Sequence, residues 1–254
     1  GCRQDRTGLM SADHTARSVT VRDVSKLSRR RRVIGRRLRD SVTSKPPVTL
    51  HATATATEML ACTRDSSQRV TITGFIGRAA VTALHRHPEL NAHINEDSMT
   101  TFGVVNLGIA VDASAGLIVP VVRDAHMLNA AELTASITSA AVKVRDGDIT
   151  PDDLADATFT VTSLGAFGVE QFTPILDPPQ VAVLGIGCIA GRAIERDGEI
   201  GLEPIVHLSL TFDHAAVDGA PAARFLANLV DEIQHSIDSI VTQISPPSKE
   251  TSTS

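Results

Sequence analysis

The stretch LSLTFDHAAVDGAPAARFL, from Leu208 to Leu226, joins a short apolar strand to an amphipathic helix. His214 stands at the end of the strand, and Asp218 and Gly219 follow just before the helix. Gly219 permits backbone angles that other residues resist, so a tight turn is expected between the two elements. A strand end holds a side chain rigidly toward a cleft. The stretch therefore predicts that a titratable imidazole is presented at the junction of a strand and a helix.

Composition limits the functions that this histidine can serve. The chain has 254 residues, a net charge of −5 and neither Trp nor Tyr, which argues against a general nucleic-acid partner. No apolar run has membrane-spanning length and no signal-peptide pattern is found, so no membrane association is expected. Three scattered cysteines favour neither a disulfide framework nor a zinc site. These features predict a cytoplasmic protein without a metal site.

Strand-like and helix-like segments alternate along the chain. Strands are expected at 47–57, 101–112, 116–122, 157–164, 180–187 and 205–214, and helices at 28–44, 72–88, 129–147 and from 220 onward. Thr150 and Pro151 indicate the start of another helix. This order predicts one α/β domain with a large sheet, and the absence of a glycine-rich phosphate turn disfavours a doubly wound nucleotide fold. We expect a flexible arm at 1–28, the domain at 29–243 and a disordered tail at 244–254, where Ser, Thr and Pro are frequent.

The chemistry of His214 alone leaves two interpretations open. A neutral imidazole, with a pKa of about 6.5, can accept a proton from a thiol with a pKa of about 8.5. Alternatively, the histidine is satisfied within the turn and Asp218 caps the following helix. The spacing of the residues does not decide between a general base and a structural histidine.

Several motifs resemble one enzyme family in the order expected for it. The segment LTFDHAAVDGAPAARFLANL resembles the C-terminal signature of the dihydrolipoyl acyltransferase core of 2-oxo acid dehydrogenase complexes. The segments RRVIGRRLRDSVTSKPPVTL, HPELNAHI, NLGIAVDASAGLIVPVVRDA and DGDITPDDLADATFTVTSLGAFGVEQFTPILDPPQVAVLGIG are similar to further parts of that domain. The resemblance runs from about Arg31 to Ile240. It implies the chloramphenicol acetyltransferase-like fold, a two-layer α/β sandwich with a mixed sheet and flanking helices.

The resemblance also implies roles for three residues. His214 matches the general base that deprotonates coenzyme A or dihydrolipoamide for attack on a thioester. Thr162 matches a Ser or Thr whose hydroxyl stabilises the tetrahedral oxyanion, and such a donor contributes about 3–4 kcal/mol. Asp218 matches a residue that pairs with an arginine and holds the active-site turn, with Arg36 or Arg37 as the expected partner. Residues that bind the cofactor are not assigned.

The chain departs from the family pattern at two positions. Ala215 stands where the family usually has an arginine, and Pro46-Pro47 lacks the usual histidine near the first strand. Ala215 resembles chloramphenicol acetyltransferase instead, although that family lacks the SLGAFG and DPPQ segments. The segment between Thr57 and Thr71 is also shorter than usual, which puts a long helix there in doubt.

Three functions remain as hypotheses. The first is transfer of an acyl group, expected to be acetyl, between dihydrolipoamide and coenzyme A within a 2-oxo acid dehydrogenase complex. The second is small-molecule acetylation of the chloramphenicol type, and the third is a non-catalytic structural core. No lipoyl domain is recognised, so the lipoyl group would come from another chain. The resemblance implies a homotrimer, or a larger cage of trimers, with lipoyl domains and the other complex components as partners.

Overall fold

The computed structural model describes residues 22–65, 67, 69–113, 116–196, 198–236 and 240–241. Most of the predicted arm at 1–28 and all of the predicted tail at 244–254 lie outside the described residues. The helices are α1 (Arg29–Ser44), α2 (Thr57–Arg64), α3 (Ile72–Arg86), α4 (Ala130–Asp146) and α5 (Gly219–His235), with short 3-10 turns η1 (Pro88–Leu90), η2 (Ala125–Met127), η3 (Asp152–Leu154) and η4 (Gly165–Phe167). The strands are β1 (Pro47–Thr55), β2 (Ala92–Ile94), β3 (Met99–Thr101), β4 (Leu107–Ile109), β5 (Val121–Val122), β6 (Phe159–Ser163), β7 (Ala182–Arg196) and β8 (Glu199–Asp213).

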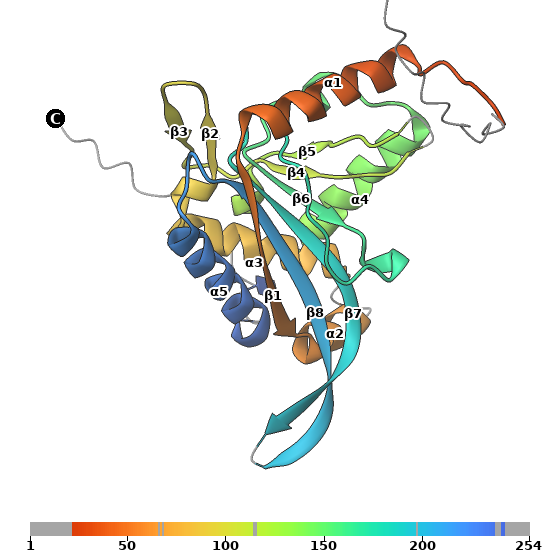
Figure 1. Ribbon diagram of the computed structural model, residues 1–254. Helices are drawn as coiled ribbons and strands as arrows, with labels where there is room; N and C mark the ends of the chain where they lie inside the picture. The colour runs from red at the N-terminus through yellow and green to blue at the C-terminus, as the bar shows by residue number, and fades with distance from the viewer. Residues whose placement is uncertain are drawn as a thin grey trace, which may run out of the picture.

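Six strands form one mixed sheet in the order β1-β8-β7-β6-β4-β5, and β2 pairs with β3 in a separate ribbon. The β4–β6 and β6–β7 pairs are parallel, whereas the other pairs of the large sheet are antiparallel. Helix α3 packs between α4 and α5 in a helical layer against the sheet (Figure 1). The predicted two-layer α/β architecture is confirmed.

The core lies between the sheet and these helices. Along β8, Leu208, Leu210 and Phe212 belong to the apolar core, whereas the alternate residues of the strand are polar. The Phe159 ring on β6 lies 6.0 Å from the Phe225 ring on α5, measured between centroids. Full burial of each such side chain stabilises the fold by roughly 1.5–3 kcal/mol. The strand is therefore anchored firmly up to the residue that precedes His214.

The long connection from β6 to β7 packs against two glycines of β7. A Cβ atom at Gly185 would lie 2.8 Å from the Phe172 ring, and one at Gly187 would lie 1.9 Å from the Glu170 carbonyl oxygen. Neither position has room for a side chain. The LGIG sequence of β7 thus permits the segment after Thr162 to lie directly on the sheet.

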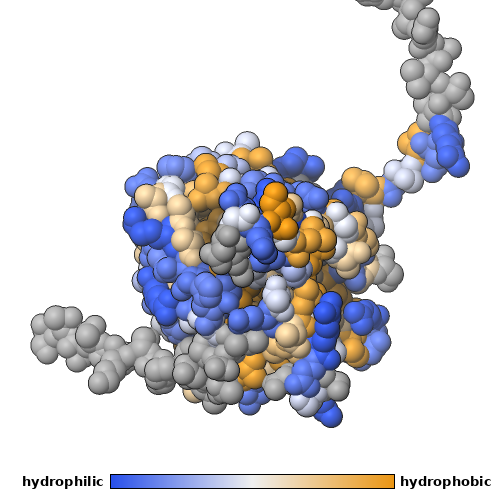
Figure 2. Space-filling model, turned by 90° about the horizontal axis from the view of Figure 1, so that it is seen from below, coloured by the Kyte–Doolittle hydropathy of each residue, from blue (hydrophilic) through white to orange (hydrophobic). Residues whose placement is uncertain are grey.

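Strands β7 and β8 form a hairpin that extends beyond the body of the domain (Figure 1). Near its tip, Ile200 and Leu202 are 80% and 77% exposed. On the face seen from below, hydrophobic and hydrophilic residues are interspersed (Figure 2). The hairpin therefore presents apolar side chains that no residue of the described ranges covers.

The helices agree with the predicted segments except at Thr150. Helix α2 has eight residues, as the short 57–71 segment indicated, and Gly147 adopts a left-handed conformation after α4. The helix expected from Thr150 is wrong, because that segment forms only the single 3-10 turn η3. Helix α1 forms as predicted, and its Val33 and Val42 side chains are exposed. In the described part of the chain, no helix combines the length and the apolar character needed to cross a bilayer.

Candidate active site

His214 is the first residue after β8 and is exposed in this chain. Its backbone N–H donates to the carbonyl oxygen of Pro46, the residue before β1, at 3.0 Å. Its ring lies 5.8 Å from the buried Phe212 ring, measured between centroids. No hydrogen bond to either ring nitrogen is found among the residues that the structure describes. The backbone of the histidine is fixed, whereas its imidazole is accessible.

A buried ion pair lies directly beside this turn. Lys45 Nζ and Asp213 Oδ2 are 3.0 Å apart, with side chains that are 8% and 3% exposed. The second carboxylate oxygen of Asp213 accepts the Ala215 N–H at 3.0 Å. Sequence analysis missed both charged residues. The adjacency of Asp213 to His214 was the available signal, and nothing in the sequence pointed to Lys45.

Thr162 lies on β6, is half-buried, and belongs to a different part of the sheet from His214. Its hydroxyl has no hydrogen bond within the described ranges. Thr162 is opposite Gly185, which is opposite Ser209 on β8, and His214 lies five residues beyond Ser209. At normal strand dimensions, Thr162 and His214 are roughly 15–20 Å apart. One chain therefore does not bring the two predicted catalytic residues together.

Asp218 occupies the N-cap position of α5, but its side chain makes no capping hydrogen bond and is exposed. The expected pair with Arg37 is not made in this chain. Instead, Arg37 contacts Asp177 at 2.9 Å and donates to the Pro178 carbonyl oxygen at 2.8 Å. No ion pair between Asp218 and Arg36 is found in the described part of the molecule either. The prediction of an Arg36 or Arg37 partner is therefore wrong for the single chain.

The DPPQ segment places Asp177 under α1. Burial raises the pKa of the Asp177 carboxyl, and the nearby Arg37 guanidinium opposes that rise. The Pro178–Pro179 peptide is cis, and Gln180 accepts a hydrogen bond from the Thr160 hydroxyl at 2.7 Å. This segment links the α1 helix to the strands that carry the candidate residues.

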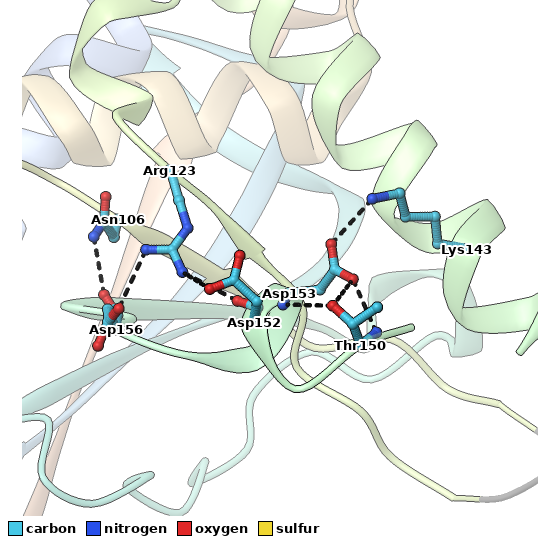
Figure 3. A network of polar contacts seen from close by, with 7 residues as sticks. All are labelled: Asn106, Arg123, Lys143, Thr150, Asp152, Asp153 and Asp156. Atoms are coloured by element: carbon cyan, nitrogen blue, oxygen red, sulfur yellow. Dashed lines mark hydrogen bonds and ion pairs between the residues drawn. The ribbon is translucent and has the colours of Figure 1, made fainter. Parts of the chain in front are cut away.

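A cleft of about 540 Å³ lies elsewhere, between α4, β5 and η3. It is lined in part by Arg123, Lys143 and Asp153, and by none of the three predicted catalytic residues. Two ion-pair groups bridge this region, with Arg123 contacting two aspartates and Lys143 contacting Asp153 (Figure 3). Because these cations are already paired, we regard the network as a structural link between α4 and the approach to β6.

Among the described residues, no group of three or more His, Cys, Asp and Glu side chains is arranged to hold a metal ion.

The catalytic-domain model of the 2-oxoacid dehydrogenases acyltransferase family matches residues 20–241. The dihydrolipoyllysine-residue acetyltransferase component of the acetoin cleaving system of Bacillus subtilis is 42% identical over 204 residues, or 77% of this chain and 51% of that protein. The chain thus spans about half the length of the curated relatives that it matches.

Solved structures of the same family are similar to this chain in fold. The cubic core of the pyruvate dehydrogenase multienzyme complex has a TM-score of 0.82 and 27% identity, covering 94% of this chain and 99% of that one. A second structure is that of the dihydrolipoamide acetyltransferase of Azotobacter vinelandii, which was studied for the catalytic roles of a serine, a histidine and an asparagine. It has a TM-score of 0.79 and 28% identity, and the match covers 86% of this chain and 94% of that one. A chloramphenicol acetyltransferase shares the fold alone, at 12% identity and a TM-score of 0.51 over 78% of this chain and 94% of that one. From the family match and this agreement in fold, the chain belongs to the family of 2-oxoacid dehydrogenase acyltransferase catalytic domains.

Proposed function

We propose that the chain is a coenzyme A-dependent dihydrolipoamide acyltransferase that transfers acetyl groups within a 2-oxo acid dehydrogenase complex. The observation that carries this proposal is the accessible imidazole of His214, held on a fixed backbone at the end of β8. The family match supports the reaction class, and the similar proteins named as acetyltransferase components support the acetyl group.

In the proposed reaction, His214 removes the proton from the thiol of coenzyme A. The thiolate sulfur attacks the carbonyl carbon of the acetyl-dihydrolipoamide thioester and forms a tetrahedral oxyanion. The hydroxyl of Thr162 donates a hydrogen bond to this oxyanion. This hydrogen bond stabilises the negative charge that develops on the oxygen in the transition state. The intermediate then collapses, the bond to the lipoyl sulfur breaks, and the imidazolium returns its proton to that sulfur. The products are acetyl-coenzyme A and dihydrolipoamide.

The intervals between the candidate residues support their assignment. In the Azotobacter vinelandii enzyme, the histidine follows the serine by 52 positions and precedes the asparagine by four. In this chain, Thr162, His214 and Asp218 have the same two intervals. A threonine retains the hydroxyl of serine, whereas an aspartate replaces the asparagine amide with a carboxylate. Asp218 therefore keeps its proposed role of holding the turn, with a partner from outside the single chain.

The separation of Thr162 from His214 supports an active site shared between subunits. We propose a homotrimer in which His214 of one subunit faces Thr162 of its neighbour, since symmetric association repeats the same contact at each interface. The exposed Ile200 and Leu202 of the hairpin, and Val33 and Val42 of α1, are apolar surface that such contacts would cover. The trimer would join a larger cage, and a lipoyl domain would deliver its lipoyl group to each interface.

An acetyl-transfer assay tests the proposal. The purified protein is given acetyl-coenzyme A and either dihydrolipoamide or chloramphenicol as the acceptor. Turnover with dihydrolipoamide and not with chloramphenicol is expected. The opposite preference would indicate a small-molecule acetyltransferase, and no turnover with either acceptor by an assembled, folded protein would indicate a structural core.

A further inference from the structure

The turn that carries His214 is attached to the connection between α1 and β1. His214 N–H donates to the Pro46 carbonyl oxygen, and Pro47 is the register partner of Asp213 at the end of the β1–β8 ladder. The α1–β1 connection therefore forms the support on which the turn rests.

Asp213 organises this turn with both its backbone and its side chain. Its carbonyl oxygen accepts the N–H groups of Ala216 and Val217, each at 3.0 Å. Its carboxylate accepts the Ala215 N–H through one oxygen and binds Lys45 through the other. The carboxylate thus contacts the residue after His214 and the support beneath it at the same time.

The ion pair is costly to bury, because both groups lose their hydration and their attraction must compensate for this loss. An apolar pair would fill the same space without that loss. The pair nevertheless involves the residue directly before His214, and its carboxylate also holds the N–H of the residue directly after it. This placement indicates a role in addition to holding the fold together.

We propose that Lys45 and Asp213 are positioning residues for His214, an inference that rests on the proposed function. The pair fixes the backbone from which the imidazole projects, and the two opposite charges cancel beside it. Other charged groups on elements that meet this turn include Asp218 at the start of α5, the Arg37–Asp177 pair between α1 and the segment before β7, and Arg36 and Asp40 on α1. Removal of one member of the buried pair therefore leaves a single net charge next to the base.

Four variants of the full chain test this role: Lys45→Met, Asp213→Asn, the double variant that carries both changes, and Lys45→Arg. Lys143→Met is the matched control, because it removes an ion pair of the same 3.0 Å length on α4, away from His214. For each protein, kcat, KM for both thiol substrates, the pH profile of kcat/KM, subunit assembly and Tm are measured.

We expect Lys45→Met to lower kcat at least about tenfold, with little change in KM, because small misplacement of a catalytic group has large effects on rate. An uncompensated carboxylate favours the imidazolium, so the acid limb of the profile moves to higher pH by roughly one unit. Asp213→Asn leaves the ammonium group and moves the limb to lower pH. The double variant keeps the low kcat, but the acid limb of its kcat/KM profile returns to the parental position. Lys45→Arg keeps the positive charge and retains most of the parental activity.

The double variant leaves no unpaired buried charge, so it remains decisive if a single variant fails to fold. A folded double variant with parental kcat would overturn the proposal. So would single variants whose acid limbs stay in place or move in the same direction, since a purely structural pair would change only Tm. If the parental protein itself shows no His214-dependent thiol exchange, the proposed function has failed instead.

Discussion

At the residue scale, the site combines a rigid backbone with a free side chain. His214 is tied to Pro46 through its N–H, while its ring has no hydrogen-bond partner in the described residues. A structural histidine within a strand-to-helix turn would direct a ring nitrogen to a nearby carbonyl or carboxylate. The observed arrangement instead leaves both nitrogens available to a substrate thiol, and this favours the role of a base.

We expect His214→Ala to lower the rate of acetyl transfer by at least about a hundredfold, because general base catalysis contributes about 10²–10⁴. The side chain is exposed in this chain, so Tm should change little. Thiol exchange and thermal denaturation check the two parts of the prediction. His235→Ala, at the exposed end of α5, is the control and should retain parental activity. Unchanged turnover in His214→Ala would show that His214 is not the general base.

For Thr162→Ala, we expect kcat to fall about 10²–10³-fold with little change in KM, because the hydroxyl is needed mainly in the transition state. Steady-state kinetics with both thiols separates the two parameters. Thr162→Ser keeps the hydroxyl and should retain most of kcat. A loss confined to KM would make Thr162 a binding residue.

His214 and Thr162 could be predicted as site residues because each belongs to a short motif that resembles the family, whereas no motif marks Lys45. Lys45 and Asp213 are 168 positions apart and meet only when β1 pairs with β8. A single sequence contains no local signal for such a contact. The expected Arg37 partner of Asp218 is not found within the single chain for a related reason, because Asp177 lies beneath α1 and pairs with Arg37 instead.

At the scale of elements, close approach of the β6–β7 connection to β7 depends on glycine. For Gly187→Ala, the new Cβ would overlap the Glu170 carbonyl oxygen, which belongs to the backbone and cannot rotate away. Overpacking of this kind costs about 1–3 kcal/mol, so in a domain of this size Tm should fall by roughly 2–12 °C. Gly201→Ala on β8, where nothing lies within 4 Å of the new Cβ, is the matched control and should leave Tm nearly unchanged. Equal Tm values for the two variants would contradict this explanation.

The stability that the ion pair between α4 and η3 contributes should depend on pH. Hydrogen bonds from the side chain and backbone of Thr150, followed by the contact with Lys143, hold the pKa of Asp153 at about 2 (Figure 3). A carboxylate with a lowered pKa in the folded state stabilises the protein above its usual pKa of about 3.9. This contribution is lost as the pH falls from about 4 to about 2.

We therefore expect Asp153→Asn to lower Tm at pH 7 by roughly 1–2 °C, with a difference from the parent that disappears between about pH 4 and pH 2. Thermal denaturation over this range measures the difference. The exposed Asp148 lies on the same connection, and Asp148→Asn should match the parent throughout. A pH-independent difference for Asp153→Asn would show that its carboxylate charge is not responsible.

Elements with local signals were predicted well, and those that depend on distant partners were not. Asn129 and Glu132 form a capping box at the start of α4, and Gly147 ends it, so this helix is specified within its own sequence. The predicted strand at 180–187 is only part of β7, which continues to Arg196. The additional residues pair with β8 across the hairpin, and Ile200 and Leu202 at its tip remain exposed.

At the scale of the whole molecule, the sheet separates the two halves of the proposed chemistry. His214 ends β8, and Thr162 lies on β6 with β7 between them. A hydrogen bond from Thr162 to an oxyanion beside His214 is impossible across roughly 15–20 Å within one chain. If both residues act in one step, they must come from different subunits.

Mixing two inactive proteins tests this consequence directly. Neither His214→Ala nor Thr162→Ala alone contains an intact pair, but a His214→Ala subunit supplies Thr162 to a neighbour that retains His214. If equal amounts exchange subunits at random within trimers, about one quarter of the interfaces carry both groups, because each independently has an even chance of being intact. We therefore expect recovery of up to about a quarter of parental thiol-exchange activity. Mass spectrometry of differently tagged subunits confirms that hybrids have formed. Hybrid trimers without recovered activity, or a fully active monomer in sedimentation, would show that each site lies within one chain.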